Sequence, residues 1–340
     1  MRVGLIGDFS IHDEARGIIS SNLYRELSKL CEVYDIDVRK LFSSESLKKL
    51  KLDLDIVCYI PGASTLSFLI TRGAKILSRK SKTVMLSTLL GFHGFSHGIY
   101  YGLSSLTKGL IPFIKTDLVL VQSEDAEKLF RELGCNVKFF VSSGVDLERF
   151  HPVSESEKSK LREKYGIDVE RFVVLHVGSI RRWRNVEVLK DIQDIPDTQL
   201  LLIGRTSTRF EQDVASLLEK KGCMIINDFL PRIEEVYALS DCYVFPTMDP
   251  VGSIDIPLSV LEAMATNLPV VSTRFGGLPR IFEDGNGVVY VHSVSDIVGE
   301  IKDLRKMRDE VKTRELVSPY SWTKIADELM RVYRELNHQR

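Results

Sequence analysis

VFPTMDPVGSIDIPLSVLEAMATNLPVVST, Val244–Thr273, is the most informative stretch of this sequence of 340 residues. Its first apolar run ends at Phe245 and is typical of a buried strand. Pro257 suits the first turn of a helix over 258–266, and Asn267 ends that helix before a second apolar run begins. A strand, a helix and a strand in this order predict a parallel α/β sheet.

The same alternation extends outward to both ends of the chain. The expected strands of the first half are Val3–Ile6, Val33–Val38, Ile56–Ile60, Thr83–Ser87, Leu118–Val121 and Val137–Val141. Those of the second half are Phe172–Val177, Leu200–Ile203, Met224–Ile226, Cys242–Phe245, Val270–Ser272 and Val288–Val291. Helical patterns separate these runs, as at 123–133, where Ser123 suits the N-cap. We therefore expect two Rossmann-like, doubly wound parallel-sheet domains that face a cleft.

A polar, charged segment at Phe150–Lys164 separates the two halves and is typical of a linker that runs into a helix. A chain of this length is also too long for one small core. We therefore expect an N-terminal domain over 1–150 and a C-terminal domain over 151–340.

Composition and charge exclude several classes of protein. The formal net charge is -1 and the sequence pI is about 6.7, so nucleic acid is not an expected partner. The five cysteines are scattered without CxxC spacing, which favours free thiols in a reducing compartment over a disulfide or zinc site. The first apolar run is too short for a signal peptide, and 54–77 is too interrupted to span a membrane. These features predict a cytoplasmic protein, with a peripheral contact at the inner membrane face left open.

Glu262 is the one acid in the nearly apolar helix over 258–266, so its carboxylate needs partners. Two interpretations have about even weight: hydrogen bonds from ribose hydroxyls of a donor nucleotide, or satisfaction by local protein groups. The following FGGLP contains Gly276, Gly277 and Leu278 at the start of a predicted helix, where backbone N–H groups can bind a diphosphate. Gly17, which opens the first helix, is either a second diphosphate contact or a plain turn residue.

Three arginines, Arg181, Arg182 and Arg184, lie in GSIRRWRN directly after an expected strand. Guanidinium groups at that position can neutralise a leaving nucleotide. A solvated basic loop is the alternative for any one of them, but for at least one of the three we favour a function.

The loop LLGFHGFSH places Phe92, His93 and His97 after an expected strand of the first half. Histidines beside aromatic rings suit binding of a sugar or acceptor, although surface positions without a role are the common case. No third ligand completes a zinc pattern, so no metal is expected. The segment 97–113 is either a core helix, which we favour, or an interfacial helix that meets a lipid-linked acceptor.

Taken together, these segments resemble the retaining, family-4 glycosyltransferases of the GT-B fold. LEAMATNLPVVST, FGGLP, IFEDGNGVVY and NDFLPRIEEVYALSDCYVFPT carry the resemblance in the second half. SSGVDLERFHP resembles the family's junction, and SPYSWTKIADELMRVYREL resembles its closing helix. The resemblance implies that this last helix, at about 320–337, packs back on the N-terminal domain.

The resemblance also implies transfer of a sugar from a UDP- or GDP-type donor to an acceptor hydroxyl, with retention and without a metal or other cofactor. It implies that Arg184 lies at the diphosphate, that Glu262 is the second glutamate of a paired motif, and that Leu230 contacts the donor. A glycan, a lipid-linked sugar or a small molecule is the implied acceptor. His93 and His97 both compete for the match to the family's histidine near the reaction centre, and we assign it to His93.

Two positions depart from the family pattern. Ile254 replaces the first glutamate of the pair, and we expect adjacent Asp255 to supply that carboxylate at the reaction centre. Ser179 stands where the family has arginine. These changes keep open a degenerate transferase that binds a nucleotide-sugar or a partner without turnover. A sugar-nucleotide epimerase ranks lower, because Asp8, Asp13 and Glu14 are its only candidate acids in the N-terminal half.

Overall fold

A computed structural model describes residues 1–9, 14–88, 109–204, 211–306 and 311–338. The chain forms two compact units. The first unit comprises Met1–Gly144, Ile254–Ile256 and Trp322–Arg340, and the second comprises Val145–Ser253 and Pro257–Ser321. The chain thus enters the second unit at Val145, shortly before the boundary expected at 150. A short loop segment and the last helix belong to the first unit.

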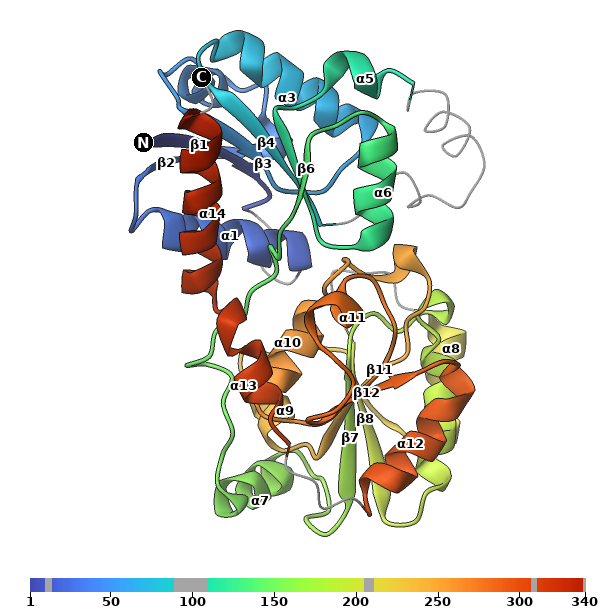
Figure 1. Ribbon diagram of the computed structural model, residues 1–340. Helices are drawn as coiled ribbons and strands as arrows, with labels where there is room; N and C mark the ends of the chain where they lie inside the picture. Colours follow the sequence, from blue (N-terminus) through green and yellow to red (C-terminus); the bar gives the residue numbers. More distant parts are fainter. Residues whose placement is uncertain (10–13, 89–108, 205–210, 307–310, 339–340) are drawn as a thin grey trace. The chain divides into compact units, whose positions relative to one another are not determined.

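The first unit is built on a six-stranded parallel sheet in the order β2-β1-β3-β4-β5-β6 (Figure 1). Its strands are β1 (Arg2–Gly7), β2 (Glu32–Asp37), β3 (Ile56–Tyr59), β4 (Lys82–Ser87), β5 (Leu118–Val121) and β6 (Val137–Phe139). Its described helices are α1 (Ala15–Leu27), η1 (Val38–Lys40), α2 (Ser44–Leu50), α3 (Thr65–Leu77), α5 (Ile111–Ile114), α6 (Glu124–Glu132) and α14 (Trp322–His338). The inner strands are buried along their length, as expected where helices cover both faces of a parallel sheet.

The last helix, α14, packs along α1 in the first unit. Its buried side includes Leu329 and Tyr333, and Trp322 lies against Gly144 so closely that a Cβ at Gly144 would be 2.6 Å from the indole ring. Glu26 on α1 is buried and accepts a hydrogen bond from the Thr323 hydroxyl (3.2 Å). Apolar contact and this polar bond together hold the C-terminal helix in the first unit.

The second unit has a parallel sheet in the order β12-β11-β10-β7-β8-β9. Its strands are β7 (Phe172–Val177), β8 (Thr198–Ile203), β9 (Met224–Ile226), β10 (Cys242–Phe245), β11 (Val270–Thr273) and β12 (Val288–Val291). Its α-helices are α7 (Glu155–Lys164), α8 (Gln212–Lys220), α9 (Glu234–Ala238), α10 (Leu258–Ala265), α11 (Leu278–Ile281), α12 (Ile297–Leu304) and α13 (Thr313–Val317). Short 3₁₀ helices are η2 (Arg182–Arg184), η3 (Val186–Asp194), η4 (Pro250–Gly252), η5 (Val294–Asp296) and η6 (Ser318–Tyr320).

The structure confirms the two doubly wound parallel sheets, and each of the twelve expected strands is present within a few residues of its expected bounds. The Ser123 hydroxyl caps α6 by accepting from the N–H of Ala126 (3.3 Å). Asn267 ends α10 with a left-handed φ of 59°. The helix expected to begin at Leu278 is present and spans four residues. Most of the segment 97–113 lies outside the described residues.

All five cysteines lie in the described part of the chain and are free thiols. Cys58 and Cys242 are fully buried in the strands β3 and β10. Within the described ranges, no helix combines the length and the apolar character needed to cross a bilayer.

Candidate functional site

The order of strands in the second sheet reverses between β7 and β10. β8 and β9 follow β7 on one side, whereas β10, β11 and β12 lie on the other. In open α/β sheets, ligands bind at the carboxyl ends of the strands where the order reverses. The loop that contains η2 follows β7, and the loop that contains η4 follows β10, so both begin at this point. These two loops therefore form the centre of the candidate site.

Arg184 lies between the two loops because glycines line its path. A Cβ on Gly178 would lie 2.5 Å from Nη1 of Arg184, and a Cβ on Gly252 would lie 3.6 Å from its Cγ. Any side chain at Gly178 would therefore displace the guanidinium. The following residue, Asn185, adopts a left-handed φ of 57° and donates from its side chain to the carbonyl of Pro246 (3.1 Å). This bond ties the β7 loop to the end of β10.

His176, near the end of β7, is fully buried beside this arginine. One ring nitrogen, Nδ1, lies 3.0 Å from the carbonyl of Val244. The other, Nε2, has no hydrogen-bond partner in the described structure, and it would lie 3.3 Å from a Cβ on Gly178. Burial lowers the pKa of His176 to about 4; the Val244 carbonyl opposes this change and the charge of Arg184 adds to it. The imidazole is therefore neutral at physiological pH, with Nε2 as an acceptor.

Glu262, on α10, is half-buried and accepts a hydrogen bond from the hydroxyl of Tyr237 on α9 (2.7 Å). Tyr237 stacks on Tyr243 with ring centroids 6.0 Å apart, and Tyr243 donates to Ser259 on α10 (2.8 Å). A local protein group therefore does contact the Glu262 carboxylate. A carboxylate has room for several hydrogen bonds, so this contact fixes its orientation and still allows a ligand hydroxyl to bind.

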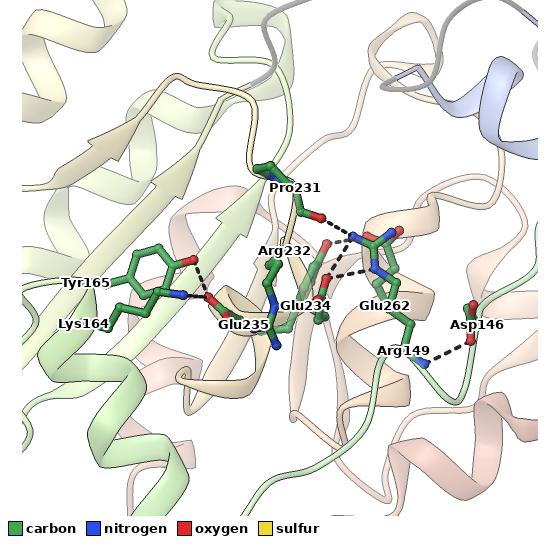
Figure 2. Close-up of polar contacts among 10 residues, drawn as sticks. Asp146, Arg149, Lys164, Tyr165, Pro231, Arg232, Glu234, Glu235 and Glu262 are labelled. Carbon is green, nitrogen blue, oxygen red and sulfur yellow. Dashed lines mark hydrogen bonds and ion pairs between the residues drawn. The ribbon is translucent and has the colours of Figure 1, made fainter.

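Arg149 orders the loop that carries Leu230. Figure 2 shows its guanidinium reaching Glu234 on α9 and the carbonyl of Pro231, at distances of 2.9 Å and 3.0 Å. Leu230 itself is half-buried in the loop between β9 and α9. Glu262 lies in the same view, on α10, which packs against α9. The structure thus fixes the backbone next to Leu230, and its contact with a donor stays a prediction.

The other two arginines of the β7 loop have different surroundings. Arg182 is exposed and forms ion pairs with Glu187 (2.8 Å) and with Asp213. The guanidinium of Arg181 lies over the ring of Trp183, 5.3 Å from its centroid. Because acids already neutralise Arg182, it is the least suited of the three to a diphosphate. Its expected role as a donor contact has no support in its geometry.

Gly276, Gly277 and Leu278 form the turn into α11. Gly276 has a left-handed φ of 54°, which a glycine adopts without strain, and Gly277 is the N-cap residue. The N–H of Leu278 donates to the carbonyl of Phe275 (3.1 Å). A helix of four residues has a small dipole, so an anion here would depend on individual N–H groups and on nearby arginines.

Asp255 does not join the residues of the second unit. The structure assigns Ile254–Ile256 to the first unit, where the N–H of Asp255 donates to the carbonyl of Thr88 and Ser123 donates to its carboxylate, both at 2.9 Å. Burial raises the pKa of Asp255 to about 7; the Ser123 hydrogen bond opposes this change and the charge of Asp125 adds to it. The carboxyl is therefore half-protonated near neutral pH, and its role at a donor sugar stays a prediction.

The remaining expected site residues belong to the first unit. Gly17 is buried in the first turn of α1. Phe92, His93 and His97 lie outside the described residues, so their acceptor-side role stays a prediction. Among the alternative acids, Asp8 pairs with Arg39 (3.1 Å). In the described part of the chain, no three His, Cys, Asp or Glu side chains are placed to hold a metal ion.

Sequence reasoning missed His176 and Tyr237. His176 interrupts the apolar run FVVLHV two residues before Gly178, and a titratable residue in a buried strand near its carboxyl end is a usable signal. Tyr237 gave no such signal, because its partner Glu262 lies on another helix, 25 residues away in sequence.

Comparison with known proteins agrees with this geometry. Residues 157–321 match the family described as glycosyl transferases group 1. A sulfoquinovosyl transferase from Arabidopsis thaliana is 30% identical over 180 residues, which cover 52% of this chain and 34% of that protein. An alpha-maltose-1-phosphate synthase from Mycolicibacterium smegmatis is 25% identical over 224 residues, which cover 58% and 56%. The chain thus spans about a third to two thirds of the length of the curated relatives that it matches.

Solved structures share the fold. A sucrose-phosphate synthase from Thermosynechococcus elongatus superposes with a TM-score of 0.77 at 18% identity, with all of both chains covered. HepE from Anabaena, in complex with UDP-glucose, superposes with a TM-score of 0.71 at 16% identity and covers 98% of this chain and 100% of its own. At these identities the superpositions bear on the fold alone. The family match covers most of the second unit, including Arg184, Glu262 and the FGGLP turn, and in this region the chain is similar to the group 1 glycosyl transferases.

Proposed function

We propose that this chain is a retaining glycosyltransferase that moves a sugar from a UDP- or GDP-type nucleotide-sugar to an acceptor hydroxyl. The observation that carries the proposal is Arg184, which lies in a path lined by Gly178 and Gly252 where the order of the second sheet reverses. Its cationic group can bind a diphosphate and stabilise the charge that develops as the nucleotide leaves. The solved relative with UDP-glucose and the sugar transferases among the curated relatives support a donor of this class.

In this proposal Arg184, His176 and Glu262 each have one task. Arg184 binds the diphosphate, and neutral His176 beside it adds no competing positive charge. Glu262, oriented by Tyr237, accepts hydrogen bonds from the ribose hydroxyls. Stabilisation of the leaving group by a guanidinium makes a metal unnecessary, so we propose a reaction without metal or other cofactor.

The acceptor side is proposed from the family resemblance. The acceptor is a glycan, a lipid-linked sugar or a small molecule bound by the first unit, and His93 assists at the reaction centre. A cytoplasmic location belongs to the same proposal, because all five cysteines are free thiols.

A chain that binds a nucleotide-sugar without turnover is the second candidate. Ile254 stands at the first acidic position of the family motif, and the neighbouring carboxylate of Asp255 is bonded to Ser123 within the first unit. The second candidate therefore predicts donor binding through Arg184 and Glu262 with no transfer to any acceptor.

Thermal unfolding with UDP, GDP, ADP, dTDP and their sugar conjugates tests donor binding without a known acceptor. A ligand that binds the native state raises the melting temperature by mass action. We expect one nucleotide to raise it and the Glu262→Ala variant to lose the shift. The matched control is Glu219→Ala, at an exposed position of α8, which should keep the shift. No shift with any nucleotide at millimolar concentration contradicts both candidates, whereas a shift without transfer favours the second.

A further inference from the structure

The described helices α3 and α5 of the first unit expose an unusual number of large apolar side chains. On α3, Leu66 and Ile76 are 65% and 63% exposed, and Leu69 between them is 48% exposed. On α5, Phe113 is 80% exposed and the preceding Leu110 is 50% exposed. The two helices pack against each other, as Figure 1 also shows, so these exposed side chains are carried by neighbouring elements of the first unit. We call these five residues the α3–α5 face.

The pattern along α3 explains why this face is exposed. Leu66, Leu69 and Ile76 follow a spacing of three and seven residues, which places them on one side of a helix. The opposite side is already used, because Phe68 and Ala74 are buried in the core of the first unit. The helix therefore has apolar residues both toward the core and toward solvent. Contiguous exposed apolar surface of this kind marks an interaction site in a water-exposed protein.

Charge decides which partner fits the α3–α5 face. No Asp or Glu occurs between Asp55 and Asp117, whereas seven Lys or Arg do, in a chain that has 46 basic and 47 acidic residues in all. Arg72 is exposed on α3, and Arg79 is exposed just beyond its end. Within the described part of the chain, neither makes an ion pair. Lys75 on α3 and Lys80 do pair with acids, Asp117 (2.5 Å) and Asp53 (3.5 Å). Arg72 and Arg79 are therefore the cations of this region that no acid of the described structure neutralises.

An anionic bilayer surface matches both properties at once. Apolar side chains on an interfacial helix enter the boundary between headgroups and acyl chains, and Lys and Arg beside them attract anionic lipids. A second copy of this chain fits less well, because Arg72 and Arg79 of one copy would meet the same cations of the other. We propose that the α3–α5 face is a peripheral docking surface for an anionic lipid bilayer. This inference goes beyond the proposed transfer reaction and does not depend on turnover.

Flotation of the full chain with vesicles tests this inference directly. Vesicles of phosphatidylcholine alone are compared with vesicles that also contain phosphatidylglycerol. We expect binding to the anionic vesicles, and we expect salt to weaken it because screening reduces the attraction of Arg72 and Arg79. The Phe113→Asp and Leu66→Asp variants should each weaken it roughly tenfold or more, since each loses the transfer of a large apolar side chain from water. Both positions are exposed, so the variants should melt as the parent does.

Two matched controls distinguish the α3–α5 face from any exposed apolar residue and from any exposed basic residue. Phe42→Asp changes a phenylalanine that is 87% exposed elsewhere in the first unit, and binding should be unchanged. The pair Arg72→Glu and Arg79→Glu should abolish the preference for anionic vesicles, whereas the pair Lys160→Glu and Lys220→Glu, exposed in the second unit, should leave it intact.

Three results overturn the inference: no binding of the parent to anionic vesicles, equal loss in Phe42→Asp and Phe113→Asp, or a change of oligomeric state in Phe113→Asp that accompanies the loss. The thermal shift with nucleotides, measured on the same samples, reports separately on the proposed function. Vesicle binding without a nucleotide shift would keep this inference and contradict the donor site.

Discussion

The two units share one sheet architecture, but they differ in chemistry at the carboxyl ends of their strands. In the second unit these ends bring together the guanidinium of Arg184 and the imidazole of His176, and α10, which follows β10, carries the carboxylate of Glu262. In the first unit, Ser87 ends β4, Gln122 follows β5 directly and Ser143 lies four residues beyond β6, and all three are buried and neutral. Within the described structure the Oγ atoms of Ser87 and Ser143 and Nε2 of Gln122 have no hydrogen-bond partner. The fold fixes where a site lies, and the residues that follow each strand fix its chemistry.

Each unit also buries a titratable side chain, an acid in the first unit and a base in the second. Burial raises the pKa of Asp255 in the first unit to about 7 and lowers that of His176 in the second to about 4. Both groups are therefore held toward their neutral forms. The folded chain binds the proton of Asp255 more tightly than the unfolded chain does. The contribution of Asp255 to the free energy of unfolding is therefore present at low pH and lost as pH rises from about 4 to about 7. The contribution of His176 is present above about pH 6.5 and lost as pH falls toward about 4.

The largest expected effect is in the charged second unit. Arg184→Ala should lower kcat/KM for transfer about 100- to 1,000-fold, because the variant removes a cation aimed at the leaving diphosphate. Steady-state kinetics with the nucleotide-sugar found by thermal shift would measure it. Arg182→Ala is the matched control in the same loop, and its acid-paired side chain predicts less than about a threefold change. Equal losses in the two variants would contradict the assignment of Arg184.

The second effect concerns the buried carboxyl of the first unit. Between about pH 5 and about pH 8 the parent should lose about 2–3 kcal/mol of unfolding free energy through Asp255, because ionisation inside the fold is unfavourable. Asp255→Asn, which resembles the protonated form, should remove this dependence. Denaturant unfolding reports on the first unit through Trp322 when Trp183, in the second unit, is replaced by Phe. An unchanged pH dependence in Asp255→Asn would show that another group causes it.

A smaller effect is expected at His176. His176→Gln keeps a side-chain donor for the Val244 carbonyl but changes the acceptor beside Arg184, so we expect roughly a tenfold fall in kcat with little change in donor KM. The loss of stability below about pH 6.5 should also disappear. His292→Gln, at an exposed position of the same unit, is the control. A parallel fall in both variants would deny His176 a role in positioning the arginine.

The smallest effect is expected at the neutral end of the first sheet. Ser143→Ala should change the unfolding free energy by no more than about 0.5 kcal/mol, since its hydroxyl has no partner to lose within the described structure. Gln122→Ala should cost about 1–3 kcal/mol, because its Oε1 accepts from the N–H groups of Ser142 (2.8 Å) and Ser143 (3.1 Å). Calorimetry of both variants tests the contrast. A large cost for Ser143→Ala would reveal an ordered water at that hydroxyl.

The sequence by itself determined the two parallel sheets and most boundaries of their strands, because apolar runs and helix-ending residues such as Asn267 act locally. It also predicted the segments with Arg184, Glu262 and Gly276 as candidate site segments, since polar residues that follow buried strands gather at one edge of a parallel sheet. These predictions needed no knowledge of contacts between distant residues.

Only the tertiary structure decided how these residues are partnered. Sequence spacing gave no sign that Tyr237 orients Glu262, that Asp213 pairs with Arg182, or that Asp255 is bonded to Ser123, 132 residues away. The same holds for the α3–α5 face, where an apolar residue on a helix can point toward the core or toward solvent. Burial and hydrogen bonding depend on which distant elements pack together, and a local pattern does not contain that information.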